Sequence, residues 1–430
     1  MKITNIGGAT AIVEHNNIRI LFDPWLDDGI FSGSWYHFPP SKLTPSDLGH
    51  FDYIYISHIH EDHCSKGTIK YLNRDAEILL MNRDPNLVER FLEVNHFNFK
   101  KIHLISPFTP TIITPGLTVD MITADPSHKY NYYIDSAIVL KWDDFTLYNA
   151  NDCAPYPDGL NYLKKNYPVI DLALIPYAGG SGYPACYLNL SHEQKISESQ
   201  KIQKKCIDRF VQNFEMLRPD KIMPFADQYV IAGSRYALNE FLSHPVGPGS
   251  VFESMKKIGH ENKLLLLNPD QIYDFETNLK WPNEEYAFPT EDDKKTYIEN
   301  HLTKKKYEFE LFELNKGIAI ERLFKYARDR MWLEQTKQNY FPSFTYYFLI
   351  NDRQRLFEIK LTGQEVKEIS ITEKQNENYL LLSCSFDLFV YLLLGHISWN
   401  IADAALFIDY ERVPNIYDTK ISAFVNFLRI

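Results

Sequence analysis

The chain has few cysteines, and their spacing does not indicate a disulfide framework. Its 430 residues include five cysteines, an odd number, spread from Cys64 to Cys384. Small domains that depend on disulfides usually carry an even number of closely spaced cysteines. The sequence also opens directly into a strand-like pattern at Lys2–Ile6, without the basic and then apolar segments of a secretory signal. We therefore expect a protein of a reducing compartment, the cytoplasm.

Long apolar runs are also missing. The most apolar late segment, Leu388–Leu394, is too short to cross a bilayer and is preceded by Asp387. We expect no membrane partner.

Positive charge is in deficit, with 45 Lys and Arg against 56 Asp and Glu and a net charge of −11. A long phosphate backbone would be repelled by such a surface unless a local basic patch overcame the field. The two main basic runs, Lys201–Lys205 and Lys304–Lys306, are typical of solvated faces. We expect a small-molecule substrate and no nucleic acid, and leave open whether the chain forms a homo-oligomer.

The length exceeds one ordinary hydrophobic core, so two domains are expected. A segment rich in Pro, Glu, Asp and Lys at Trp281–Asp293 is the best linker candidate. We predict a first domain over residues 1–285 and a smaller α+β domain over residues 286–430. In the second, a helix over Gly317–Gln335 precedes a strand meander and a last strand at Ala405–Tyr410, an order similar to sterol-carrier-like domains.

The first domain alternates between short apolar strands and amphipathic helices. Strands are expected at, among others, Ile18–Asp23, Phe51–Ile56, Leu117–Thr123 and Lys221–Phe225, with a long helix over Ser191–Leu217. Strands mixed with helices in this order predict an α/β fold in which two sheets lie between outer helices, an αββα sandwich.

A cluster of metal-binding side chains follows the strand Phe51–Ile56. The run reads Ser57-His58-Ile59-His60-Glu61-Asp62-His63. Four groups that can bind a metal stand within six residues, at a place where a packed core would otherwise continue. On an extended segment His58 and His60 point the same way, and Asp62 and His63 at the following turn can face a second metal. Imidazoles and a carboxylate suit zinc, iron or manganese.

This run resembles the signature of the metallo-β-lactamase superfamily. The resemblance implies that Asp23, after the strand Ile18–Leu21, supports the metal site. It also implies that His128 is the third ligand of the first metal and that Asp152 bridges the two metals.

Within the superfamily the chain is similar to the lactamase-like part of the cytidine monophosphate-N-acetylneuraminate hydroxylases. The similarity rests on the segments 56–65, 151–153, 177–184, 224–226 and 410–417, and on Asp135 after His128. Glycines let a backbone approach a ligand closely. We therefore predict a substrate-binding role for Gly179, Gly180, Ser181 and Tyr183; a plain flexible turn is the alternative.

Two departures limit what this similarity implies. Those hydroxylases carry a Rieske iron–sulfur domain, whereas no Cys-x-His or Cys-x-x-His pair occurs in this sequence. An oxygenase would then need an external reductase. The superfamily also closes its second metal with a late His, whereas here Pro224-Phe225 leads into Ala226-Asp227. Asp227 either replaces that ligand or is a turn residue, and the loss of an imidazole favours manganese or iron over zinc.

Hydrolysis is the leading hypothesis for function. One or two divalent metals would activate a water for attack on a small ester, lactone, phosphoester or nucleotide-sugar-like substrate, with Asp62 and Asp152 as catalytic carboxylates. The alternatives are an iron-dependent oxygenase served by a separate electron donor, and a degenerate metal-binding protein.

Overall fold

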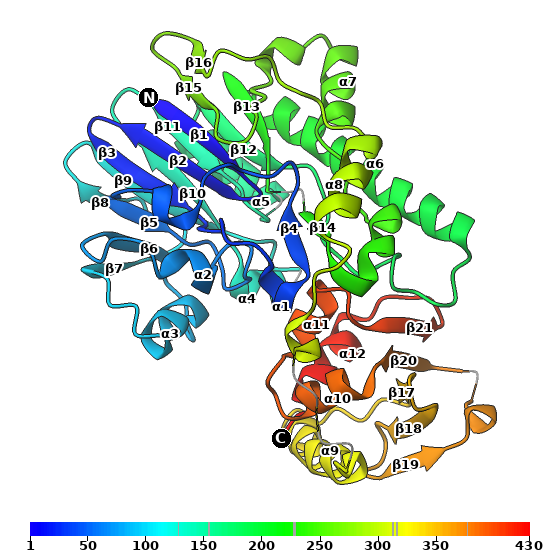
Figure 1. Ribbon diagram of the computed structural model, residues 1–430. Helices are drawn as coiled ribbons and strands as arrows, with labels where there is room; N and C mark the ends of the chain where they lie inside the picture. The colour runs from blue at the N-terminus through cyan, green and yellow to red at the C-terminus, as the bar shows by residue number, and fades with distance from the viewer. Residues whose placement is uncertain (128, 154, 227–228, 312–313, 315–316, 376) are drawn as a thin grey trace.

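Two facing β-sheets form the centre of the first domain in this computed structural model (Figure 1). The structure describes residues 1–127, 129–153, 155–226, 229–311, 314, 317–375 and 377–430. The first sheet contains, in spatial order, β16 (Leu279–Trp281), β15 (Ile272–Asp274), β1 (Lys2–Gly7), β2 (Thr10–His15), β3 (Ile18–Phe22), β5 (Tyr53–Tyr55), β6 (Glu77–Met81) and β7 (Lys101–Ile105). The second contains β13 (Lys221–Phe225), β12 (Leu172–Pro176), β11 (Thr146–Asn149), β10 (Ser136–Lys141), β9 (Leu117–Thr123) and β8 (Thr111–Thr114).

The alternation of side chains along the strands explains why the sheets face each other. In β3, Ile20 and Phe22 join the core between the sheets, whereas Leu21 joins the core on the outer face. Met121 and Ile122 of β9 divide in the same way between the inner and outer cores. Successive residues of a strand point to opposite faces, so strands that are apolar throughout are buried on both sides.

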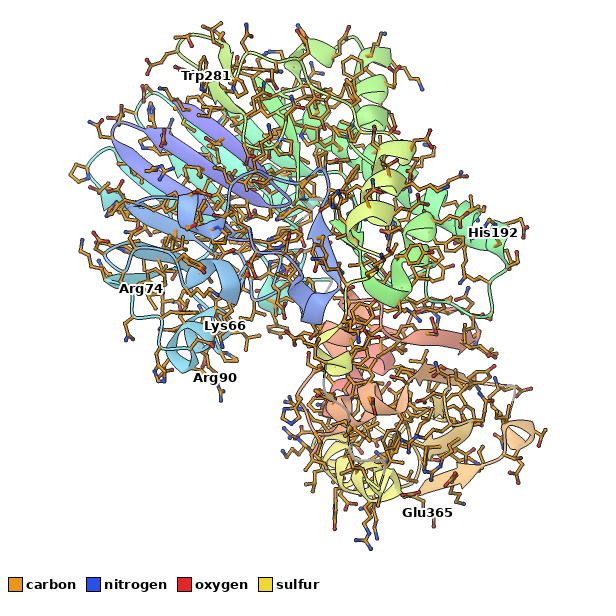
Figure 2. The ribbon with its side chains drawn as sticks, viewed as in Figure 1. Lys66, Arg74, Arg90, His192, Trp281 and Glu365 are labelled. Carbon is orange, nitrogen blue, oxygen red and sulfur yellow. The ribbon has the colours of Figure 1, made fainter. Side chains whose placement is uncertain are left out.

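Helices cover both outer faces. The first sheet carries α2 (Lys66–Ile69) and α3 (Leu87–Val94), and the second carries α5 (Pro157–Asn166), α6 (His192–Leu217) and α7 (Gly249–Lys257). Lys66 and Arg90 are labelled on the outer helices of the first sheet (Figure 2). The predicted αββα sandwich is confirmed.

Parallel pairing brings strand ends of both sheets to one edge. In the first sheet β3, β5 and β6 run parallel, and in the second β11, β12 and β13 do. The start of β10 lies at the same edge as the end of β11, because these two strands are antiparallel. The loops after β3, β5 and β11 therefore meet at one edge of the sandwich, together with the segment that precedes β10.

The C-terminal part is built on a five-stranded sheet. Its strands, in spatial order, are β19 (Val366–Ile369), β18 (Arg355–Lys360), β17 (Thr345–Ile350), β20 (Tyr379–Cys384) and β21 (Asp409–Val413). Its helices are α9 (Ile320–Lys337), α10 (Phe386–Leu393), α11 (Trp399–Ala404) and α12 (Thr419–Phe424). The predicted α+β character and the antiparallel meander are confirmed. The sterol-carrier likeness stays a prediction.

The two parts share a core. Trp35 in β4 (Trp35–His37), which pairs with β14 (Tyr229–Ile231), donates its indole N–H to the carbonyl of Ala404 at 2.8 Å. Arg235 donates two hydrogen bonds of 2.6 and 2.9 Å to Asp409.

The boundary at residue 285 stays a prediction. Beyond it, α8 (Glu291–His301) packs Ile298 against Tyr36 and Val230 of the β4–β14 pair.

Between β3 and β5 the chain forms the short helix α1 (Ile30–Gly33) and then β4. The predicted bounds of the last strand are wrong. The last strand begins at Asp409 rather than Ala405, because α11 ends at Ala404 and Leu406 then adopts a left-handed conformation (φ 59°). Among the described residues, no helix is long and apolar enough to span a bilayer.

Two buried histidines make the fold sensitive to acid. Burial lowers the pKa of both His37 and His244 to about 4, so both are neutral in the folded chain at pH 5. In the unfolded chain these groups bind protons below about pH 6.5. Because the unfolded state gains the protons, the stability from each histidine is present above that pH and is lost as the pH falls toward 4.

We therefore predict that lowering the pH from 7 to 5 costs about 2 kcal/mol of unfolding free energy for each of these histidines. In His244→Gln the loss should shrink by one such contribution, whereas the control His50→Gln, at an exposed site, should lose as much as the wild type. Urea unfolding of the metal-free proteins at both pH values measures this. Equal losses in all three proteins would contradict it.

Candidate metal centre

A buried carboxylate anchors the histidine run at the sandwich edge. Asp23, directly after β3, is fully buried and accepts hydrogen bonds from the backbone N–H of Ser57 at 2.7 Å and from its hydroxyl at 2.8 Å. His63 Nδ1 lies 2.9 Å from the same carboxylate. Burial raises the pKa of Asp23, and His63 and Ser57 oppose that rise. Asp23 thus fixes the start and the end of the run.

These contacts determine which nitrogens face the site. The single hydroxyl proton of Ser57 is donated to Asp23, so Ser57 Oγ accepts from His58 Nδ1, 3.0 Å away. His63 likewise donates from Nδ1 to Asp23. The Nε2 lone pairs of His58 and His63 are therefore left for a metal, the usual effect of an outer partner on a ligating histidine. His60 turns Nδ1 toward His58 Nε2, at 2.8 Å.

Two carboxylates complete the inner surface. Asp62, within the run, and Asp152, after β11, each place an oxygen 3.4 Å from His63 Nε2. Ligand atoms of His58, His63 and Asp152 all lie within 4.8 Å of one another. Burial alone would lower the pKa of His63, but Asp152, Asp62 and Asp23 raise it well above its usual value. Two sheets, distant in sequence, thus contribute to one cluster.

A third carboxylate lies at the cluster and was not among the ligands predicted from the sequence. Asp135, at the start of β10, is buried, and its Oδ1 has no hydrogen-bond partner and lies 3.9 Å from His58 Nε2. Burial, and then the nearby Asp152, raises the pKa of Asp135 to about 8. Its place directly before the apolar strand β10, which pairs with the strand that leads to Asp152, is the signal that could have found it.

Six of the predicted site residues stay predictions. His128 and Asp227, predicted as ligands, fall outside the described residues, so both stay predictions. Gly179 accepts a hydrogen bond from Ser243, and the tyrosine hydroxyl of Tyr183 donates to Glu198 of α6. Among the contacts described for Gly179–Tyr183, none joins the segment to the histidine run, and its substrate role stays a prediction.

The C-terminal part reaches the cluster through one side chain. The Asn400 amide, on α11, lies 3.2 Å from His60 Nε2. Because Nδ1 of His60 faces the site, Nε2 is the nitrogen left to carry a proton. An amide offers an oxygen to accept that proton after a half-turn of its plane. Asn400 is thus placed as an outer partner of His60.

Known proteins with related sequences extend along much of the chain, although no family model matches it. A protein of Mycolicibacterium smegmatis named as a putative Rieske 2Fe-2S iron-sulfur protein is 28% identical over 286 residues, which cover 64% of this chain and 54% of that protein. The cytidine monophosphate-N-acetylneuraminic acid hydroxylase of Danio rerio is 26% identical over 348 residues, 78% of this chain and 55% of the hydroxylase. The chain spans about half the length of these relatives.

In this chain a His-x-His-x-Asp-His run stands at the edge of an αββα sandwich. Two facing sheets between outer helices, with the histidine run at one edge, agree with the resemblance to the metallo-β-lactamase superfamily that the sequence suggests.

Solved structures that are similar to the chain include enzymes of different chemistry. An isothiocyanate hydrolase from Delia radicum gut bacteria is 15% identical, with a TM-score of 0.44, and covers 64% of this chain and 99% of its own. CmlA, a diiron β-hydroxylase from Streptomyces venezuelae, is 14% identical, with a TM-score of 0.43, and covers 62% and 53%.

The residues of this cluster fit a metal. Asp135 is buried and its Oδ1 has no hydrogen-bond donor, and the Nε2 lone pairs of His58 and His63 face the same space. Buried groups of this kind are normally paired or bound to a cation. With Asp62 and Asp152 the described donors are nitrogen and carboxylate oxygen in near-equal number, a set that suits iron or manganese as well as zinc.

We predict that His63→Ala lowers the bound metal by at least one equivalent per chain, because the variant loses a ligand nitrogen and leaves Asp62 and Asp152 without their shared neighbour. Elemental analysis after dialysis measures the metal content. The control His192→Ala changes an exposed histidine on α6 and should leave the content unchanged. Full metal content in His63→Ala would contradict the assignment.

A second prediction concerns Asn400. Removal of an outer partner of a ligating histidine typically costs 10- to 100-fold in metal affinity. We expect Asn400→Ala to raise the metal Kd at least about tenfold in a competition titration against a chelator. The control Asn98→Ala, at an exposed site between α3 and β7, should bind as the wild type does. An unchanged Kd in Asn400→Ala would remove Asn400 from the metal centre.

Proposed function

We propose that the protein is a metal-dependent hydrolase that acts on a small ester, lactone, phosphoester or nucleotide-sugar-like substrate. The observation that carries this proposal is the pair of carboxylates, Asp62 and Asp152, each 3.4 Å from His63 Nε2. Hydrolysis needs a proton acceptor beside the attacking water, and these side chains supply two candidates within the metal cluster.

The exposure of each side chain distinguishes the residues that would hold the metal from those that act on the water. When bound, a divalent metal lowers the pKa of a coordinated water toward about 7 and polarises the oxygen under attack. His58, His60 and His63, with Asp152 and Asp135, are the residues that would hold it. The Asp62 side chain is one-fifth exposed, and it can orient the water and take its proton. Asp23, fully buried behind Ser57 and His63, keeps the imidazole of His63 in place.

A small substrate is supported by charge. The chain carries a net charge of −11, and the cluster itself contributes several carboxylates. A long polyanion would be repelled from such a site, whereas a compact substrate with one reactive centre would not.

The second candidate is an iron-dependent hydroxylase. It is favoured by the name of the Danio rerio relative and by Asp135, which makes the donor set richer in oxygen. This reaction takes oxygen and two electrons, so it requires a separate donor such as an iron–sulfur or flavin reductase. Hydrolysis requires only water and groups that the cluster contains.

We predict that the protein hydrolyses a panel of activated small esters and lactones, that chelation abolishes the activity and that added metal restores it. Asp62→Asn should lower kcat by about 10²- to 10⁴-fold with little change in metal content, because an amide cannot accept the proton. Asp75→Asn, a control at an exposed carboxylate, should match the wild type.

Activity that persists after complete chelation would refute the hydrolase. Oxygen consumption that depends on iron and on an added reductase, without hydrolysis by any metal form, would establish the second candidate instead.

A further inference from the structure

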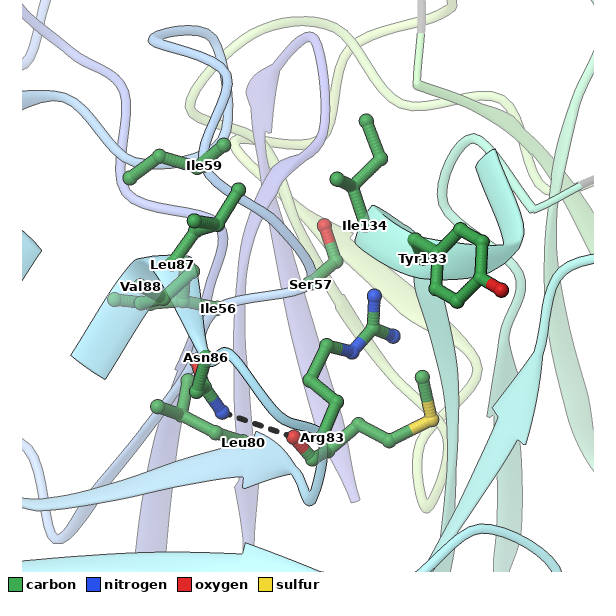
Figure 3. A pocket seen from close by; sticks show the side chains of 11 residues that line it. Ile56, Ser57, Ile59, Leu80, Arg83, Asn86, Leu87, Val88, Tyr133 and Ile134 are labelled. Carbon is green, nitrogen blue, oxygen red and sulfur yellow. Dashed lines mark hydrogen bonds between the residues drawn. The ribbon is translucent and has the colours of Figure 1, made fainter. Parts of the chain in front are cut away.

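The middle of the histidine run is held differently from its two ends. Asp23 fixes the first and the last residue of the run through its contacts with Ser57 and His63. Ile59 packs against the core on the outer face of the first sheet, beside α3 (Figure 3). The residues that follow, 60–62, are only partly buried. Their position therefore depends on contacts with other segments.

Glu61 makes such a contact. Its carboxylate accepts a hydrogen bond of 2.5 Å from the backbone N–H of Phe31 in α1. Phe31 is buried and adopts φ 50° and ψ 57°, and Ser32 follows with φ 56°. Residues other than glycine rarely adopt this left-handed conformation, and they keep it only where surrounding contacts hold them. The middle of the run is thus joined to a turn whose backbone is itself held in place.

The segment that Glu61 contacts also holds α11. The hydroxyl of Ser34 and the indole of Trp35 each donate a hydrogen bond of 2.8 Å to a carbonyl at the end of this helix. The same helix carries Asn400, whose amide lies 3.2 Å from His60 Nε2. His60 is therefore connected to the C-terminal part twice, directly through Asn400 and indirectly through its neighbour Glu61.

We propose that Glu61 is a positioning residue of the metal centre, which holds the middle of the run where Asn400 reaches His60. This inference goes beyond the proposed hydrolysis and rests on the metal cluster alone. Glu61 acts by its length and by its acceptor oxygen, because its partner is a neutral backbone N–H. A mere cap of the α1 turn would stabilise the fold and leave the metal affinity unchanged.

Two conservative variants separate length from charge. Glu61→Gln keeps an acceptor oxygen on a side chain of the same length, whereas Glu61→Asp keeps the charge on a side chain that is shorter by one methylene. In a competition titration of zinc against a chelator, Glu61→Asp should raise the metal Kd at least about tenfold, since the contribution of Asn400 is lost with it. Glu61→Gln should stay within about twofold of the wild type, as should the control Glu93→Gln, at an exposed carboxylate on α3.

A double variant tests the connection to Asn400. If Glu61 places the run for Asn400, adding Asn400→Ala to Glu61→Asp should raise the Kd by less than about twofold further, because that contact is already lost. Residues that act independently would instead multiply their effects, to about a hundredfold in the double variant.

Every result of these titrations decides the proposal. An unchanged Kd in Glu61→Asp would overturn it, and with a lower urea-unfolding free energy of the metal-free variant it would make Glu61 a cap of the α1 turn. Multiplied effects in the double variant would also overturn it. If Glu61→Asp fails to fold, Glu61→Gln still decides, since a tenfold higher Kd there would make the charge of Glu61 the cause.

The titrations involve no turnover, so they are independent of the esterase assays. A protein that binds zinc with the expected dependence on Glu61 but hydrolyses no ester or lactone would refute the hydrolase and leave this inference standing.

Discussion

The buried carboxylate of Asp23 holds together the ends of two neighbouring strands and both ends of the histidine run. It accepts hydrogen bonds from the backbone and hydroxyl of Ser57 and contacts Nδ1 of His63. Hydrogen bonds to a charged group contribute about 1.5–3 kcal/mol each, and inside a protein they also fix geometry. Because Ser57 gives its only hydroxyl proton to Asp23, the orientation of His58 depends on the same carboxylate. The inner surface of the metal centre is thus built outward from a residue that does not itself face the metal.

The metal centre also depends on the packing of two sheets and of the C-terminal part. The first sheet supplies the histidine run, and the second supplies Asp135 and Asp152 from the β10–β11 region. The C-terminal part adds Asn400 beside His60, and it is held there by the bonds of Trp35 and Arg235 across a shared core. A change far from the cluster in sequence can therefore alter it through strand or domain position.

Local patterns predicted much of this structure because they depend on neighbours along the chain. The apolar segments predicted β9 and β13 at their observed bounds, and the helix predicted over Ser191–Leu217 differs from α6 by one residue, since Ser191 is its N-cap. The last strand was predicted to begin at Ala405, four residues before its observed start at Asp409. The segment between these residues is apolar for a reason other than burial in a sheet. Leu406 and Phe407 fill the core that both parts share, in the turn after α11.

The sequence by itself determined the kind of site. Four metal-binding groups within six residues have no ordinary packing explanation, and the run stands after a strand that the pattern also predicts. Only the tertiary structure decided which further residues join it. Asp135 and Asn400 each look like an isolated polar residue in sequence. The place of Asp135 follows from its burial with an unpartnered Oδ1, and that of Asn400 from a contact with His60 over 340 residues. Such contacts depend on how the sheets and helices pack, and no local spacing encodes that packing.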